Sequence, residues 1–108
     1  TSVDAALQAM VEPRRREILR VIWHAEMPAG EIALHFAGEV TRPAISQHLK
    51  VLREAGLIDE RRDGTRRLYR ARPEGLAELR NYLEMLWDTG LERLKAAAEE
   101  ESARGESK

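Results

Sequence analysis

The sequence predicts a mainly α-helical protein with a small β-hairpin, made of about five helices and two short strands. Three observations support this prediction. The chain has 108 residues and is 43% apolar, which suits one domain with a modest core. Most of its apolar residues recur three or four positions apart, as on one face of a helix. One Asp63-Gly64 pair between two extended segments indicates a tight hairpin turn.

The first three expected helices lie in the N-terminal third of the chain. Residues 3–10 have the apolar spacing of one short helix. Pro13 suits the start of the second, because its missing N–H costs nothing in a first turn. Residues 27–30 interrupt that helix, and a third, short helix covers residues 32–36. Gly38 then ends it.

The fourth expected helix begins after Thr41 and ends before Gly56. The hydroxyl of Thr41 suits an N-cap, and a glycine commonly follows a helix C-terminus. Spacings of four and three place the apolar residues of this segment on one face: Ile45, Leu49 and Leu52. The third and fourth helices therefore form a helix-turn-helix.

The hairpin and the last helix follow. Extended runs at residues 57–62 and 65–71 flank Asp63-Gly64, and Pro73 ends the second strand. Apolar residues then keep helical spacing from Leu76 to Ala98. At 1.5 Å per residue this helix is roughly 35–40 Å long, too long for so small a body to cover.

The domain boundary is expected near residue 98. Residues 1–98 are assigned to one folded domain that also mediates dimerisation, and residues 99–108 to a polar, disordered tail without apolar periodicity. Because the body cannot cover the last helix, a second copy of the chain is expected to do so. The predicted dimer interface comprises Val3, Leu7, Met10, Leu83, Leu86, Trp87, Leu91 and Leu94.

Charge is concentrated in the middle of the chain. The formal net charge is −1, but residues 41–72 hold nine basic and four acidic side chains, a net charge of +5. The segments before and after carry −2 and −4. A basic segment between acidic ends favours a nucleic-acid partner that the overall charge conceals.

A helix-turn-helix followed directly by a hairpin is the winged helix-turn-helix arrangement, which suits duplex DNA. The exposed face of the fourth helix carries Gln47, which can make paired hydrogen bonds to adenine, and Arg42, which can do the same to guanine. Arginines around the hairpin turn suit phosphates or the minor groove. The expected DNA-binding residues are Thr41, Arg42, Pro43, Ser46, Gln47, His48, Lys50, Arg62, Arg66 and Arg67.

Two groups of residues allow two interpretations each. His48 lies at the edge of the buried face, so we expect a partly buried ring bonded to the backbone, with a base contact as the alternative. Three consecutive arginines, Arg14 to Arg16, open the second helix, where the helix dipole disfavours positive charge. We expect them to pair with Glu12 or Glu17, with contacts to the DNA backbone as the alternative.

Three segments of the chain carry a resemblance to a known family: residues 12–19 (EPRRREIL), 41–58 (TRPAISQHLKVLREAGLI) and 64–70 (GTRRLYR). Over roughly residues 3–98 the chain resembles the ArsR/SmtB family of bacterial winged-helix repressors. The resemblance implies a homodimeric repressor whose fourth helix reads the major groove and whose hairpin is the wing. The first and last helices would form the dimer, and the operator would be an inverted repeat.

The resemblance does not extend to metal sensing. The chain has no cysteine, so the family's Cys-x-Cys site lacks its ligands at residues 31–36, and no histidine follows His48 for the site on the last helix. We expect no metal and no cofactor. A metal-responsive repressor with non-cysteine ligands, and a winged-helix module that binds another protein, remain the alternatives.

Other function classes find no support in the sequence. No Ser-His-Asp spacing or phosphate-binding glycine loop is present, so no enzyme is expected. No apolar run approaches the length of a membrane span, and no signal peptide opens the chain. We therefore expect a cytoplasmic, sequence-specific DNA-binding regulator. The operator, the regulated genes and any effector are not encoded in these patterns.

Overall fold

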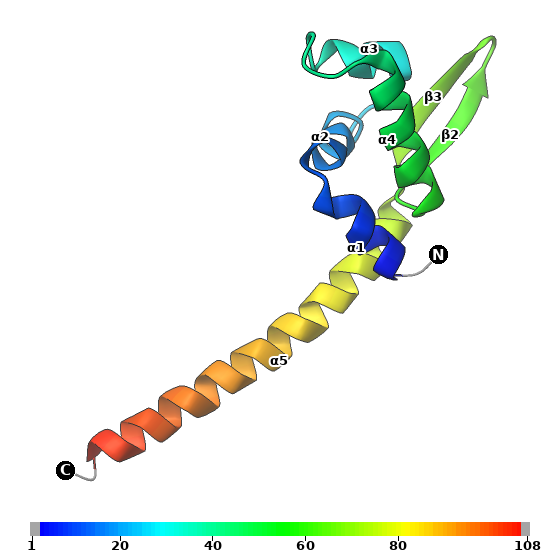
Figure 1. Cartoon of the computed structure of the whole chain (residues 1–108). Helices are drawn as coiled ribbons and strands as arrows, with labels where there is room; N and C mark the ends of the chain where they lie inside the picture. Colours follow the sequence, from blue (N-terminus) through cyan, green and yellow to red (C-terminus); the bar gives the residue numbers. More distant parts are fainter. Residues whose placement is uncertain (1–2, 107–108) are drawn as a thin grey trace.

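The computed structural model describes residues 3–106 and confirms a mainly helical chain with a hairpin (Figure 1). Five helices and three strands are present in this range. Their order is α1 (Val3–Val11), α2 (Pro13–Val21), β1 (Met27–Pro28), α3 (Ala29–Leu34), α4 (Arg42–Glu54), β2 (Ile58–Asp63), β3 (Arg66–Ala71) and α5 (Pro73–Glu106).

The sheet has one more strand than the sequence predicted. Its order is β1-β3-β2, antiparallel throughout, with Met27 opposite Tyr69 and Pro28 opposite Leu68. Residues 27–30 were expected only to interrupt a helix, and β1 is too short for a recognisable pattern. Proline has no N–H to donate, so its place on an edge strand follows from its chemistry.

The hairpin turn lies one residue later than expected. Asp63 pairs with Arg66 as the last residue of β2, and the two-residue loop is Gly64-Thr65. Gly64 has φ +65°, a left-handed conformation that glycine adopts without a steric penalty. Such loops match the twist of the flanking strands and fix their register.

The core is formed by one face of each of the first four helices, the base of the hairpin and Leu79 of α5. The predicted stripe of α4 is confirmed, because Ile45, Leu49 and Leu52 are at most 1% exposed. Ile18 and Ile32 bring α2 and α3 into the same cluster. The helix-turn-helix is therefore held by burial of one side of α4, and its other side faces solvent.

The arginines of α2 cap the preceding helix. Arg15 Nε donates to the carbonyl of Ala9 at 2.6 Å, and Arg16 Nη1 donates to the carbonyls of Met10 and Val11. These are carbonyls at the C-terminus of α1, where cations offset the helix dipole.

Arg14 instead pairs with Glu39 at 2.9 Å and lies over the Phe36 ring. Glu12 serves as the N-cap of α2, accepting from the Arg14 N–H at 2.9 Å. The expected ion pairs with Glu12 or Glu17 were therefore wrong. The free carbonyls of α1 and a more distant carboxylate offer these side chains partners that the local sequence does not reveal.

Helix α5 leaves the body and extends far beyond it (Figure 1). It has 34 residues, which corresponds to about 50 Å. The expected disordered tail is corrected for residues 99–106, which continue the helix. Alanine and glutamate, which dominate residues 96–101, are strong helix formers and need no apolar face to stay helical. No helix within residues 3–106 is both long and apolar enough to cross a membrane.

Two glycines form the joint between α5 and the body. Gly56 follows α4 with φ +75°, and its carbonyl accepts from Arg72 Nη1 at 2.9 Å. The backbone of Arg72 also donates to the carbonyl of Leu57 at 2.8 Å. A Cβ on Gly75 would lie 2.0 Å from the Gly56 oxygen. The first turn of α5 therefore touches backbone that no side-chain rotation can move away.

We expect Gly75→Ala to destabilise the fold by about 1–3 kcal/mol, the usual penalty for overpacking. The added methyl group must displace either the Gly56 carbonyl or the first turn of α5. The midpoint of urea unfolding should fall accordingly. Gly105→Ala is the matched control, because its Cβ would meet no atom within 4 Å. A Gly75→Ala midpoint equal to that of the unmodified protein would show that the joint is loose.

Candidate nucleic-acid interface

The N-terminus of α4 and the tip of the hairpin lie at the same end of the molecule, away from α5 (Figure 1). Thr41 caps α4 as predicted, accepting from the Ala44 N–H at 3.2 Å. The predicted polar residues on the solvent side of the helix are exposed: Pro43, Ser46, Gln47 and Lys50. Arg42 is exposed too, and its guanidinium packs 3.5 Å from the position a Cβ would take on Gly30.

One row of α4 side chains borders the hairpin. Ser46, Lys50 and Arg53 are four and three residues apart, so they share one flank of the helix. Arg53 Nη1 lies 2.9 Å from Glu60 Oε1 on β2. This ion pair places the C-terminal end of the row beside the hairpin.

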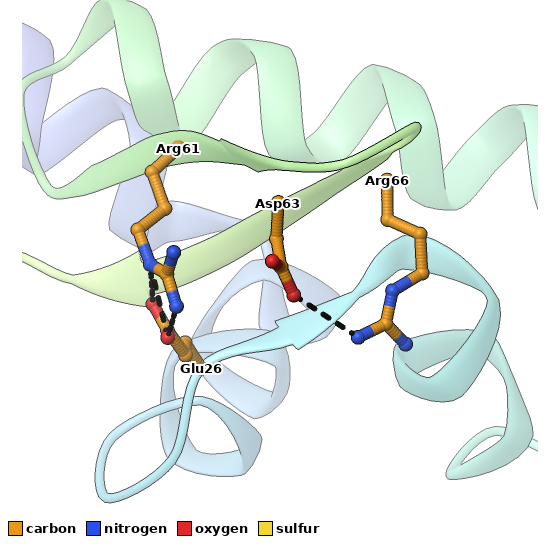
Figure 2. Close-up of polar contacts among 4 residues, drawn as sticks. All are labelled: Glu26, Arg61, Asp63 and Arg66. Atoms are coloured by element: carbon orange, nitrogen blue, oxygen red, sulfur yellow. Dashed lines mark hydrogen bonds and ion pairs between the residues drawn. The ribbon is translucent and has the colours of Figure 1, made fainter.

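The hairpin face that carries Arg61 and Arg66 is internally neutralised (Figure 2). Arg61 donates through Nε and Nη2 to the carboxylate of Glu26, with Nε 2.9 Å from Oε2. The hydrogen bond with Arg61 lowers the pKa of Glu26, and that with Glu26 raises the pKa of Arg61. Arg66 pairs with Asp63 at 3.3 Å across the turn.

The opposite hairpin face carries two facing cations. Arg62 and Arg67 are directly opposite in the β2–β3 register, and both are exposed. Like charges in this position repel each other, which an anion between them would relieve. Arg67 has one distant partner, Glu60 at 3.9 Å, and Arg62 has no carboxylate within 4 Å among residues 3–106.

The ion pairs reduce the basic segment to a few available charges. Six of the nine basic side chains in residues 41–72 pair with carboxylates: Arg53, Arg61, Arg66, Arg67, Arg70 and Arg72. Arg42, Lys50 and Arg62 form no ion pair within the described part of the chain. All three were predicted as DNA-binding residues, and all three are exposed.

Sequence reasoning missed the acidic residues that hold the arginines. Glu26 is 35 residues from Arg61, and no local pattern links them. Glu60 lies between Arg53 of α4 and Arg67 of β3, a contact set by the packing of the hairpin on the helix. The alternation of side chains along β2 was the available signal. It predicts that Arg61 lies on one face of the hairpin, and that Glu60 and Arg62 lie on the other face.

His48 is half-buried, as expected, but the expected bond to the backbone is not formed. Its Nδ1 is buried and has no hydrogen-bond partner within residues 3–106. Burial lowers the pKa of the His48 ring, and the charges of Arg15 and Arg14 lower it further against the opposing effect of Glu12. All three of these charged groups belong to the start of α2.

A second surface lies along α5. Five of its apolar side chains, which the sequence predicted to be covered by a second chain, are 46–68% exposed in the single chain: Leu83, Leu86, Trp87, Leu91 and Leu94. These five residues are called the α5 stripe below. Val3, Leu7 and Met10 of α1 are partly buried against the core. No group of three or more histidine, aspartate or glutamate side chains within residues 3–106 is placed to hold a metal ion.

The helix-turn-helix, the adjoining arginine hairpin and the exposed polar face of α4 define a winged helix-turn-helix DNA-binding domain. The bacterial regulatory protein family named arsR matches residues 12–60. HTH-type transcriptional regulator Rv2034 of Mycobacterium tuberculosis is 44% identical over 90 residues, which are 83% of this chain and 82% of that protein. The chain belongs to the ArsR family of bacterial regulatory proteins.

Two further relatives are informative. The transcriptional repressor SdpR of Bacillus subtilis is 37% identical over 62 residues, 57% of this chain and 67% of that protein. The solution structure of a homodimeric winged helix-turn-helix DNA-binding domain, Mb0332 of Mycobacterium bovis, is 30% identical. It covers 80% of this chain and 78% of its own, with a TM-score of 0.62. The predicted fold and family resemblance are thereby confirmed.

We expect the stability of the fold to fall as the pH drops below the ordinary histidine pKa of 6.5. The pKa of His48 is lower in the folded chain than in the unfolded chain, so the unfolded chain binds a proton first as the pH falls. Proton binding stabilises the unfolded chain and lowers the free energy of unfolding. His48→Gln keeps a neutral polar side chain and should shrink this loss. Urea unfolding of the unmodified protein and of His48→Gln, at about pH 7.5 and 5.5, measures how much unfolding free energy each loses. Equal losses in the two proteins would exclude His48 as a cause.

Proposed function

We propose that this chain is a homodimeric repressor that binds an inverted-repeat DNA operator. The observation that carries the proposal is the placement of the three cations without a carboxylate partner. Arg42 and Lys50 are exposed on α4, and Arg62 is exposed on the hairpin face that also carries Glu60, the partner of Arg53 of α4. Exposed cations kept free of internal partners suit a phosphate backbone.

Helix α4 would read bases in the major groove. Its buried stripe fixes which side faces outward, and that side presents Gln47 with an amide that can pair with the N6 and N7 atoms of adenine. Ser46 and Lys50 contact a base edge or phosphates beside it, and Thr41, Pro43 and the capped N-terminus approach the backbone.

The hairpin would act as a wing that positions the domain. Arg62 and Arg67 hold a phosphate between them, which removes their mutual repulsion. Arg66 must leave Asp63 to reach DNA, so its contribution is smaller than that of Arg62. His48 is half-buried, so a base contact is assigned to its exposed neighbours Ser46 and Gln47 instead.

Dimerisation and repression are proposed from the α5 stripe and the relatives. One relative is named a repressor and another is a homodimeric DNA-binding domain. A second chain would cover the apolar side chains that the body leaves exposed, together with Val3, Leu7 and Met10. Two-fold symmetry then requires two half-sites in successive major grooves, roughly 34–36 Å apart. Such a regulator acts in the cytoplasm, and the proposal includes neither a metal nor catalysis.

We expect Gln47→Ala and Arg62→Ala to weaken DNA binding in different ways. Loss of the glutamine amide should cost about 1–3 kcal/mol on the operator and little on scrambled DNA. Loss of the arginine should weaken binding to both duplexes and make the salt dependence shallower by about one unit per phosphate contact. Fluorescence anisotropy over a salt series, with operator and scrambled duplexes, separates the two effects.

Lys95→Ala is the control for this experiment, because Lys95 is an exposed cation on the part of α5 that extends beyond the body. It should leave both affinities and the salt slope unchanged. If Gln47→Ala weakens both duplexes equally while Arg62→Ala abolishes discrimination, the hairpin reads the sequence and α4 only positions it. Binding that shows neither salt dependence nor sequence preference would favour a protein partner instead.

We expect the protein to sediment as a dimer at micromolar concentration. Leu83→Ala combined with Trp87→Ala should give monomers, since each loss of a large buried side chain costs about 2–5 kcal/mol. Asn81→Ala, on the same helix away from the stripe, is the control and should remain dimeric. A monomeric unmodified protein would contradict the proposed dimer.

A further inference from the structure

The two faces of the hairpin carry different charge. Side chains alternate along a strand, and the ion pair of Glu60 with Arg53 turns one face toward α4. That face has one acidic and two basic side chains from the hairpin: Glu60, Arg62 and Arg67. The opposite face, called the outer face below, has two acidic and three basic ones: Asp59, Asp63, Arg61, Arg66 and Arg70. Glu26, which lies outside the hairpin, adds the carboxylate that makes the outer face neutral (Figure 2).

Glu26 reaches the hairpin from the far edge of the sheet. It directly precedes β1, whereas Arg61 lies on β2, and β3 separates these two strands. The Arg61 side chain crosses β3 and donates to the Glu26 carboxylate through both Nε and Nη2. The hydrogen bond with Arg61 lowers the pKa of Glu26 most, and the charge of Arg70 lowers it as well. One carboxylate therefore acts on two arginines of the outer face.

The contacts that attach the hairpin to the body do not depend on Glu26. Ile58 at the base of β2 is 1% exposed in the core, and Arg53 of α4 pairs with Glu60 at 2.9 Å. By contrast, the side chains of Arg61 and Glu26 are 47% and 30% exposed. Exposed ion pairs contribute little to stability. The main effect of the Arg61–Glu26 pair is therefore on the electric potential of the outer face.

We propose that Glu26 is a specificity-determining residue that keeps Arg61 from binding the phosphates of DNA of any sequence. The inference rests on the proposed function and adds a carboxylate that opposes binding at the wrong sites. In the operator complex, α4 in the major groove fixes which hairpin face meets the DNA. On other sequences no base contact fixes the orientation, so the outer face also reaches phosphates. A neutral outer face therefore weakens nonspecific binding more than operator binding.

Glu26→Gln tests the proposal because it removes the charge and keeps the size of the side chain. The probes are a duplex that the unmodified protein selects from a randomised pool and a scrambled duplex of the same composition. Fluorescence anisotropy between about 50 and 200 mM salt measures binding to both. At the lowest salt the dissociation constant for the scrambled duplex should fall about tenfold, and its salt dependence should steepen by about one unit per added phosphate contact. Binding to the selected duplex should tighten less.

Glu99→Gln is the matched control, because it makes the same charge change at an exposed position on the part of α5 that extends beyond the body. It should leave both dissociation constants unchanged. The double variant Glu26→Gln with Arg61→Ala then identifies the side chain that carries the gain. If the loss of Glu26 releases Arg61, removing Arg61 should return the scrambled-duplex affinity and its salt slope to those of the unmodified protein. Circular dichroism checks that each variant is folded.

Three results would overturn the proposal. A gain that persists in the double variant would reflect the lost negative charge alone. Unchanged binding of Glu26→Gln to scrambled DNA would show that Arg61 is not restrained, and weaker binding to the selected duplex would show that the ion pair positions the hairpin. An unmodified protein that selects no duplex would contradict the proposed function instead, since the release of Arg61 is measured on scrambled DNA and needs no sequence preference.

Discussion

The structure depends on the burial of a single side of α4. Ile45, Leu49 and Leu52 close the core against α2, α3 and the base of the hairpin, and they cannot rotate outward without losing that contact. Because a helix has fixed angular spacing, burying these three residues also decides which side chains face solvent. The face that carries Gln47 and Lys50 is thus set by the packing of the opposite face. Stability and recognition are two results of the same helix orientation.

Ion pairs refine what the charge pattern alone indicates. The central +5 segment looks uniformly basic in the sequence, yet Glu26, Glu60 and Asp63 each hold a hairpin arginine. Exposed pairs of this kind contribute little to stability, so their main effect is on where positive potential remains. Positive potential therefore remains chiefly at the cations without a carboxylate partner within residues 3–106: Arg42, Lys50 and Arg62.

Local patterns in the sequence were sufficient to predict the helices and the hairpin but not the side-chain contacts between distant segments. Thr41, Pro13 and Gly56 act through their own backbone neighbours, so the start of α4, the start of α2 and the end of α4 could be predicted. The contacts of Glu26 with Arg61, and of Arg15 with α1, join segments whose spacing carries no signal. The two-residue strand β1 was missed because its pairing is created by β3.

The end of α5 shows the limit of a different rule. Residues 99–106 were expected to be disordered because they have no apolar face, yet they are helical because helix propensity alone favours that conformation there. Apolar periodicity reports what a helix packs against, and it does not report where a solvated helix stops. The same distinction explains why the α5 stripe could be found from the sequence while the length of its helix could not.

The joint at Gly56 and Gly75 has a mechanical consequence. Backbone touches backbone there, and the Arg72 side chain donates to the Gly56 carbonyl. No flexible side chain therefore separates the start of α5 from the end of α4. The helix is a rod of about 50 Å fixed to the end of α4. A force that tilts the free end of α5 is therefore passed to α4 through backbone contacts and the Arg72 hydrogen bond. The direction in which α4 points is tied to the direction of α5.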